Sequence, residues 1–135
     1  MEISAGLLIV QQNKILLCHP TNAPWYGTYT IPKGKVEEDE TFVEAAIRET
    51  YEEVGIKIDI KDIKKKKKPN VIEYTNEKGK VYKTLYYFVV EPKMDIIVSQ
   101  NKLQKKEVDW AGFVDKDEAL SRIFWRFEEM IKNIN

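Results

Sequence analysis

Short apolar runs alternate with polar segments along most of the chain and indicate β-strands. Six such runs lie at residues 5–10, 15–18, 56–60, 71–74, 81–90 and 108–114. Turn-forming residues separate the first two runs (Gln11–Lys14) and also separate the run at 71–74 from the aromatic, β-branched run after it (Asn76–Gly79). This arrangement is typical of β-hairpins. The pattern therefore predicts two hairpins and two further strands.

Helical spacing replaces this pattern in two stretches. Thr41 followed by Glu44 is the sequence of a capping box, and it predicts a helix over residues 42–54 that ends at Gly55. A second helix is predicted from the cap at Asp115 to the end of the chain, where apolar residues keep helical spacing at Ala119, Ile123, Phe127, Met130, Ile131 and Ile134.

Residues 20–34 form the longest segment without a regular pattern. Prolines and glycines interrupt this segment repeatedly and predict a long loop with at most a short strand near Tyr29. Because strands and helices alternate around this loop, we expect an α/β layered domain with a mixed β-sheet.

Composition limits the class of protein. The 135 residues fit one domain, residues 1–135, and 22 basic residues balance 22 acidic ones. A protein that depends on non-specific phosphate contacts is usually basic, so this class is disfavoured.

The single cysteine, Cys18, excludes a disulfide framework and a four-cysteine zinc site, and we interpret it as a small buried hydrophobe. No apolar run approaches the length of a membrane span or a signal peptide, so we expect no membrane partner and a cytoplasmic protein.

The helix predicted at 42–54 carries three carboxylates on one face. With 100° per residue, Glu52 lies about −60° and Glu53 about +40° from Glu49. Each pair of like charges at these spacings costs a few tenths of a kcal/mol, roughly, so helix stability gives no reason for them. The apolar stripe of this helix is predicted on a different face from the carboxylates and consists of Val43, Ile47, Thr50 and Val54. A glutamate-rich solvated face is one interpretation, and a site for a hard cation such as Mg²⁺, with Arg48 orienting the carboxylates, is the other.

The segment Pro32-Lys33-Gly34-Lys35 favours the second interpretation. It places two cations and a backbone without a side chain just ahead of the carboxylates, and Gly34 permits a close approach to a metal ion or a phosphate. A lysine-bearing loop followed by a carboxylate-bearing helix predicts a site for Mg²⁺-bound pyrophosphate.

These residues resemble a known signature. Gly34-x5-Glu40-x7-Arg48-Glu49-Thr50-x-Glu52-Glu53-x-Gly55-Ile56 is similar to the Nudix box of the Nudix hydrolases, with all its fixed residues at residues 34–56. Thr50 stands where the pattern prefers an aliphatic residue and keeps the β-branched shape. The resemblance implies the family's α/β/α sandwich and a metal-dependent pyrophosphohydrolase that cleaves a nucleoside diphosphate linked to another moiety.

Roles for individual residues also follow from the resemblance. It implies that Glu49, Glu52 and Glu53, with the Gly34 carbonyl, bind Mg²⁺ or Mn²⁺, while Arg48 and Glu40 form an orienting pair. Either a glutamate of the box or a later loop residue accepts the proton of the attacking water in this family. Glu49 is therefore expected to serve as a ligand or base, and Glu107 is the candidate in a later loop.

The substrate is predicted from weaker similarities. Residues 25–34, Tyr74, and the strand pair Lys83 and Tyr87 resemble the dinucleoside tetraphosphate (asymmetrical) hydrolases, so we expect a dinucleoside polyphosphate such as diadenosine tetraphosphate. Residues expected to bind it are Lys33, Lys35, Tyr74, Lys83 and Tyr87. Packing of an ordinary core strand is the alternative interpretation of Tyr87 and its neighbours.

Three other functions stay open at this point. An RNA 5′-end pyrophosphohydrolase would use the run Lys64–Lys68 to contact phosphates, although such a charge run is typical of a solvated loop. The other two are a nucleoside triphosphate or nucleotide-sugar pyrophosphatase and a non-catalytic nucleotide sensor. The oligomeric state stays open as well. We interpret His19 as a surface or loop residue, and Trp110, Phe124 and Trp125 as packing residues.

Overall fold

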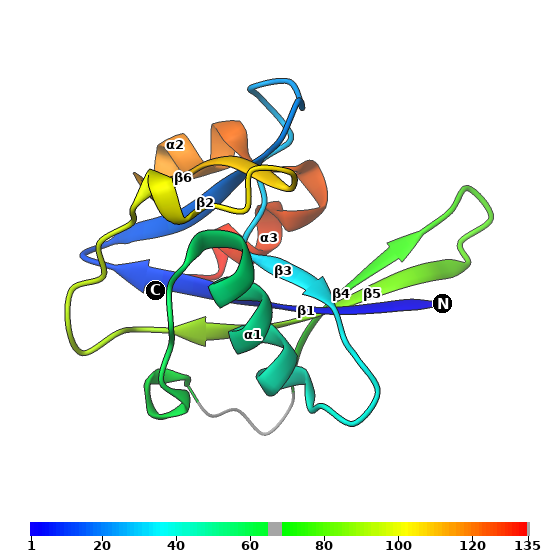
Figure 1. Ribbon diagram of the computed structural model, residues 1–135. Helices are drawn as coiled ribbons and strands as arrows, with labels where there is room; N and C mark the ends of the chain where they lie inside the picture. Colours follow the sequence, from blue (N-terminus) through cyan, green and yellow to red (C-terminus); the bar gives the residue numbers. More distant parts are fainter. Residues whose placement is uncertain (65–68, 135) are drawn as a thin grey trace.

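The computed structural model describes residues 1–64 and 69–134 and confirms the α/β class (Figure 1). Its strands are β1 (Glu2–Gln11), β2 (Lys14–Pro20), β3 (Lys33–Lys35), β4 (Asn70–Thr75), β5 (Val81–Val90) and β6 (Val108–Asp115). Its helices are α1 (Phe42–Val54), α2 (Lys116–Arg122) and α3 (Glu128–Lys132), and short 3₁₀ turns lie at Ile60–Asp62, Gln100–Lys102 and Trp125–Phe127. Both predicted hairpins, β1–β2 and β4–β5, are confirmed.

Strand β1 is the centre of a mixed sheet with the order β4-β5-β1-β2-β6. It runs parallel to β5 from the pair Glu2–Lys83 to the pair Ile9–Val90. Its other edge changes partner along its length, because β3 pairs with residues 4–6 and β2 pairs only with residues 10–11. The sheet therefore splits beside β3, and β2 and β6 form a separate wing (Figure 1).

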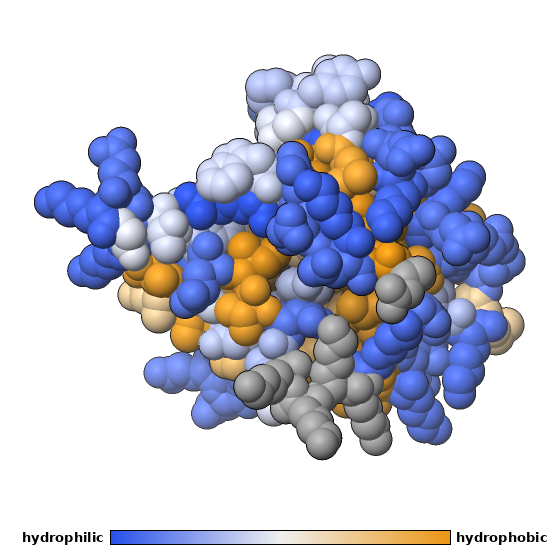
Figure 2. Space-filling model, turned by 180° about the vertical axis from the view of Figure 1, so that it is seen from behind, coloured by the Kyte–Doolittle hydropathy of each residue, from blue (hydrophilic) through white to orange (hydrophobic). Residues whose placement is uncertain are grey.

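Helices cover the two faces of this sheet. Alternate residues of β1, including Ala5, Leu7 and Ile9, pack in one hydrophobic cluster with the buried residues of α1. Leu8 belongs to the cluster on the other face, together with buried residues of α2 and α3. Seen from behind, the molecule shows apolar side chains between larger hydrophilic patches (Figure 2). The arrangement is the predicted α/β/α sandwich.

Helix α1 has the bounds and both ends that the sequence predicts. The Thr41 side chain accepts a hydrogen bond from the Glu44 N–H, and the Glu44 carboxylate accepts one from the Thr41 N–H. Gly55 ends the helix with φ 73°, a left-handed conformation that glycine adopts at little cost. A Cβ atom at Gly55 would also lie 2.6 Å from Lys102 Cβ.

Residues 56–60 are not a strand, which corrects that prediction. Ile56 and Ile58 alternate with exposed residues because they fill the cluster beside α1, and the chain then turns into the 3₁₀ segment Ile60–Asp62. Alternating burial here occurs without a β-ladder. A strand that was not predicted, β3, forms within the expected loop.

The C-terminal segment is not one continuous helix, which corrects a second prediction. Helix α2 ends at Arg122, and Ile123 is extended with φ −72° and ψ 148°. The Phe124 N–H donates to the Tyr29 carbonyl at 2.9 Å, and Tyr29 pairs with Ile123 as an isolated bridge. This long-range pairing takes residues out of the helix, although the apolar spacing favours one.

Two further predictions of the sequence analysis concern the lysine run and membrane-spanning segments. Residues 65–68 of the lysine run lie outside the described residues. Within residues 1–64 and 69–134, no helix has the length and apolar character needed to cross a membrane.

Candidate active site

An open cavity of about 530 Å³ lies between the carboxylate-bearing half of α1, strand β3, the first half of β1 and the loop before β6. Its lining consists of Glu2, Ser4, Lys33, Gly34, Lys35, Glu49, Glu52, Glu53, Lys83, Gln104 and Glu107. Most of the predicted site residues therefore meet here, from segments up to 74 residues apart in sequence (Lys33 to Glu107). Arg48, Tyr74 and Tyr87 are not part of this lining.

The acidic face of α1 is also a packing face, which corrects the predicted separation of the two. Thr50 and Val54 are buried as predicted, but Ala45 and Ala46 are buried as well. These alanines precede Glu49 by four and three residues, so they lie on the same side of the helix as the carboxylate. Packing of α1 against β1 and β3 thus carries the glutamates into the cavity.

Gly34 allows the closest approach in the site. A Cβ atom at this position would lie 2.0 Å from the Glu49 carboxyl carbon, far inside van der Waals contact. Gly34 pairs with Ala5 in the sheet, so the backbone of β3 has little freedom to move away. The absence of a side chain at Gly34 is therefore required for Glu49 to face the cavity.

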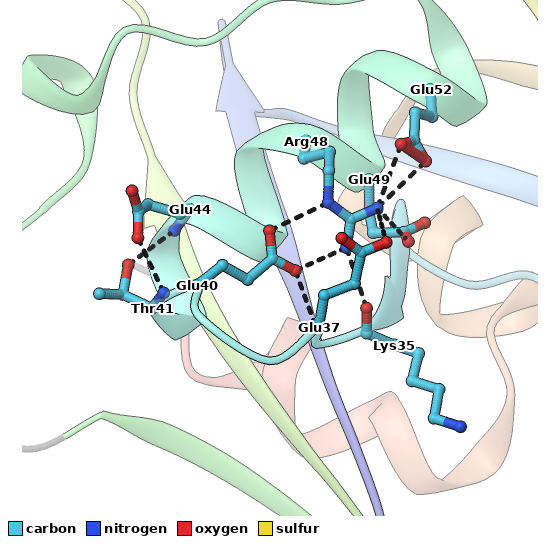
Figure 3. Close-up of polar contacts among 8 residues, drawn as sticks. All are labelled: Lys35, Glu37, Glu40, Thr41, Glu44, Arg48, Glu49 and Glu52. Atoms are coloured by element: carbon cyan, nitrogen blue, oxygen red, sulfur yellow. Dashed lines mark hydrogen bonds and ion pairs between the residues drawn. The ribbon is translucent and has the colours of Figure 1, made fainter.

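Arg48 organises the carboxylates around it (Figure 3). Its guanidinium donates to both oxygens of Glu40 at 2.6 and 3.0 Å, to Glu49 at 2.9 Å and to Glu52 at 3.1 Å. It also donates to the Lys35 carbonyl at 3.0 Å, which joins α1 to β3. The bond from Arg48 holds the pKa of Glu40 below its usual range. This network supports the orienting pair that the sequence predicts.

Burial changes the ionisation of the charged groups deeper in the cavity. It raises the pKa of Glu53 to about 7, although the Lys33 N–H donates to this carboxylate at 3.1 Å. Burial also raises the pKa of Glu49 and lowers that of Lys33. Opposite charges thus meet in a partly desolvated place, where electrostatic interactions are stronger than in water.

The donor set fits a hard divalent cation. Carboxylate oxygens from Glu49, Glu52 and Glu53 face the same cavity as Gly34, whose lack of a side chain leaves its backbone accessible. Within the described parts of the chain, no three acidic, histidine or cysteine side chains converge closely enough to hold an ion as they stand. Two of the three carboxylates, Glu49 and Glu52, form ion pairs with Arg48.

The loop before β6 brings the predicted Glu107 into the cavity. The Gln104 N–H donates to the Glu53 carbonyl at 2.9 Å, and the Glu107 N–H donates to the Gln104 carbonyl at 2.9 Å. Gln104, Glu2 and Ser4 also line the cavity but were missed by the sequence analysis. The parallel register of β1 and β5 explains the position of Glu2, because it places Glu2 beside Lys83.

The predicted substrate residues of β4 and β5 divide into two places. Lys83 lines the cavity, and its ammonium lies 3.1 Å from the Glu2 carboxylate and 5.1 Å from the centre of the Tyr74 ring. Tyr74 is buried, and the Lys83 ammonium lies over its ring. Tyr87 lines a separate cavity with Met130 and Ile134. The structure does not bring Tyr87 to the carboxylates.

The remaining sequence interpretations have mixed outcomes. Cys18 is fully buried, as expected. The interpretation of His19 as a surface or loop residue is wrong, because His19 lies in β2 and is 1% exposed. Phe124 and Trp110 pack against a core cluster, whereas Trp125 is 62% exposed and contacts Arg126.

A comparison with protein-family models gives one decisive match, in which the model of the NUDIX domain covers residues 2–134. The chain belongs to the Nudix domain family. An ADP-ribose pyrophosphatase from Methanocaldococcus jannaschii is 45% identical to this Nudix chain over 49 residues, which are 36% of the chain and 29% of that protein. The chain therefore matches less than a third of the length of this curated relative.

Solved structures confirm the Nudix fold. An Ap4A hydrolase from C. elegans superposes with a TM-score of 0.70 and 23% identity, covering 98% of this chain and 93% of that one. A dihydroneopterin triphosphate pyrophosphohydrolase from E. coli has a TM-score of 0.72 and 20% identity, with the same coverage. At these identities, the likeness concerns the fold alone.

Proposed function

We propose that this Nudix protein is a metal-dependent pyrophosphohydrolase that cleaves a nucleoside diphosphate linked to another moiety. The observation that carries the proposal is the single cavity in which Glu49, Glu52 and Glu53 face Lys33 and Lys83. Three carboxylates at these helical spacings repel one another. Beside lysines, they suit a substrate that brings both phosphates and a divalent cation.

The chain's own groups have distinct parts in this reaction. Glu49, Glu52, Glu53 and the Gly34 carbonyl would hold Mg²⁺ or Mn²⁺, which offsets negative charge on the phosphate oxygens. Lys33 and Lys83 neutralise further phosphate charge. Arg48 keeps two of the carboxylates in place through its bonds to Glu49 and Glu52.

Hydrolysis needs a base for the attacking water. The water oxygen forms a bond to phosphorus, the bond from phosphorus to the bridging oxygen breaks, and the bridging oxygen leaves with its phosphate. Glu107 or Glu49 accepts the proton of the water, since both carboxylates line the cavity. Glu49 lies on α1 and Glu107 in the loop before β6. These two segments are joined by the hydrogen bond from the Gln104 N–H to the Glu53 carbonyl.

A dinucleoside polyphosphate is the substrate class that we propose. Lys33, Lys35 and Lys83 line one cavity, so a long phosphate chain finds several cations. Tyr74 beneath Lys83 offers an aromatic ring at the edge of this track. ADP-ribose is the second candidate, because an ADP-ribose pyrophosphatase has the 45% identical segment.

A substrate panel tests the proposal. The protein is incubated with Mg²⁺ and diadenosine tetraphosphate, ADP-ribose, nucleoside triphosphates or a 5′-triphosphorylated RNA, and products are identified by chromatography. We expect cleavage of diadenosine tetraphosphate that a chelator abolishes, with Glu53→Gln as the inactive control. Metal-dependent nucleotide binding without any product would contradict the proposal and support a nucleotide sensor.

A further inference from the structure

Strand β2 meets β6 irregularly at the edge of the cavity. His19 pairs with Trp110, but the next residue, Pro20, pairs with Val108, so Asp109 is an additional residue in β6. Such a β-bulge redirects side chains and ends regular pairing, often beside an active site. The bulge lies two residues after Glu107, which lines the cavity.

One buried side chain occupies this bulge. His19 is 1% exposed, its Nδ1 lies 2.5 Å from the Asp109 carboxylate, and its Nε2 donates to the Pro24 carbonyl at 3.1 Å. Trp25 stacks on the imidazole with ring centres 4.1 Å apart and an interplanar angle of 18°. Tyr29 meets the same ring edge-on at 5.0 Å. The contacts of His19 therefore join β2, the loop after it and the start of β6.

Hydrogen bonds extend from this bulge to the cavity wall. Two residues after His19, the Thr21 N–H donates to the Glu107 carbonyl at 3.1 Å and the Thr21 hydroxyl donates to the Lys105 carbonyl at 2.6 Å. On its other side, the same turn is bonded to α1 through Gln104. The turn that carries Glu107 is thus held between α1 and the residues next to His19.

We propose that His19 is a positioning residue that directs Glu107 into the cavity through its pairing with Asp109. Within residues 1–64 and 69–134, no hydrogen bond or ion pair holds the Glu107 side chain, and the bulge at Asp109 follows two residues later. Removing the pairing leaves Asp109 without its buried partner and lets the turn shift. The inference rests on the proposed function and takes Glu107, one of its two candidate bases, as the group that accepts a proton from the attacking water.

Kinetics with a double-mutant cycle test this role. With diadenosine tetraphosphate as the probe, His19→Leu is expected to lower kcat on the order of 10-fold to 100-fold, because a misplacement of about 1 Å costs this much. KM should change less than 3-fold, roughly, because such a change affects the transition state more than substrate binding. His19→Asn keeps a donor toward Asp109 and should recover most of the rate. Tyr26→Ala, an exposed change in the same loop, is the matched control.

Coupling to Glu107 separates positioning from a general packing defect. In a Glu107→Gln background, His19→Leu should lower kcat less than about 3-fold, because the group that it positions is already gone. Equal losses in both backgrounds would overturn the proposal. A neutral Glu107→Gln would also overturn it, since His19 would have no base to position.

A measurement without turnover distinguishes this inference from the proposed function. The Glu107 and Val108 amides both donate to the Gln104 carbonyl, so their hydrogen exchange reports the turn. Asp109→Asn, which keeps the side-chain volume, is expected to speed this exchange at least about 10-fold and to leave the Ile9 amide unchanged. Unchanged exchange overturns the positioning role, whereas faster exchange in a protein that hydrolyses no nucleotide overturns only the proposed function.

Discussion

The two walls of the cavity are built in different ways. One wall is α1, in which Glu49, Glu52 and Glu53 come from two consecutive turns of a single helix. The opposite wall takes Glu2 from β1, Lys83 from β5 and Glu107 from the loop before β6. In the proposed function, the helical wall supplies the metal-binding carboxylates, and the composite wall supplies Lys83 for the substrate and Glu107 as a candidate base. Variants of the two walls should therefore have different kinetic effects.

The helical wall should give the largest loss of rate. Glu53→Gln removes a buried carboxylate from the proposed metal site and is expected to lower kcat about 100-fold or more, because such a metal stabilises transition-state charge. The measurement is steady-state kinetics at saturating Mg²⁺. A chelator should abolish turnover by the unchanged protein.

A thermal melt is the control for Glu53→Gln. The variant should melt at or above the temperature of the original protein, because burial of this carboxylate opposes its ionisation. Near-normal kcat in Glu53→Gln would remove this residue from the chemistry of the helical wall.

Gly34 tests the junction between the walls. Gly34→Ala places a methyl group where the Glu49 carboxylate lies, so we expect kcat to fall about 10-fold and stability to fall by about 1–3 kcal/mol. Glu49→Ala in the same chain removes the clash and should recover the stability but not the rate. A Gly34→Ala variant with unchanged stability would show that Glu49 can turn away freely.

The composite wall should affect KM more than kcat. Lys83→Ala removes a cation from the cavity and is expected to raise KM for diadenosine tetraphosphate about 10-fold, since a charge-assisted bond contributes about 1.5–3 kcal/mol. Tyr87→Ala is the comparison on the same strand. It should lower the melting temperature with KM unchanged, because Tyr87 packs in a different cavity. A rise in KM for Tyr87→Ala would restore the sequence-based substrate role.

The smallest expected effect concerns the support of the helical wall. Glu40 has a lowered pKa in the folded protein because Arg48 donates to it, so its stabilising contribution is complete above the unfolded pKa of about 4.3. This contribution is lost as the pH falls through the lower folded pKa. Glu40→Gln should therefore reduce stability by about 1 kcal/mol near pH 7, and the difference from the original protein should shrink below about pH 4. Urea unfolding at several pH values measures this, and a constant difference would contradict the assignment.

Features that depend on neighbouring residues could be predicted from the amino-acid sequence. The cap at Thr41, the glycine stop at Gly55 and the carboxylate spacing all act within one or two helical turns, so α1 and its chemistry could be predicted. The hairpin turns were predictable for the same reason. Gln12 and Asn13 adopt positive φ values between two apolar runs, as a tight turn requires.

Contacts between segments that are distant in sequence could not be predicted and became visible in the folded protein. Periodicity favoured a continuous C-terminal helix, but the bond from Phe124 to Tyr29 interrupts it across 95 residues of sequence (Phe124 to Tyr29). His19 looked exposed beside Pro20, yet the β-bulge buries it against Asp109. Lys83 reaches the carboxylates and Tyr87 does not, because the register of β5 against β1 places them at different ends of the sheet face. Strand pairing and packing are long-range interactions, so local sequence patterns carry little information about them.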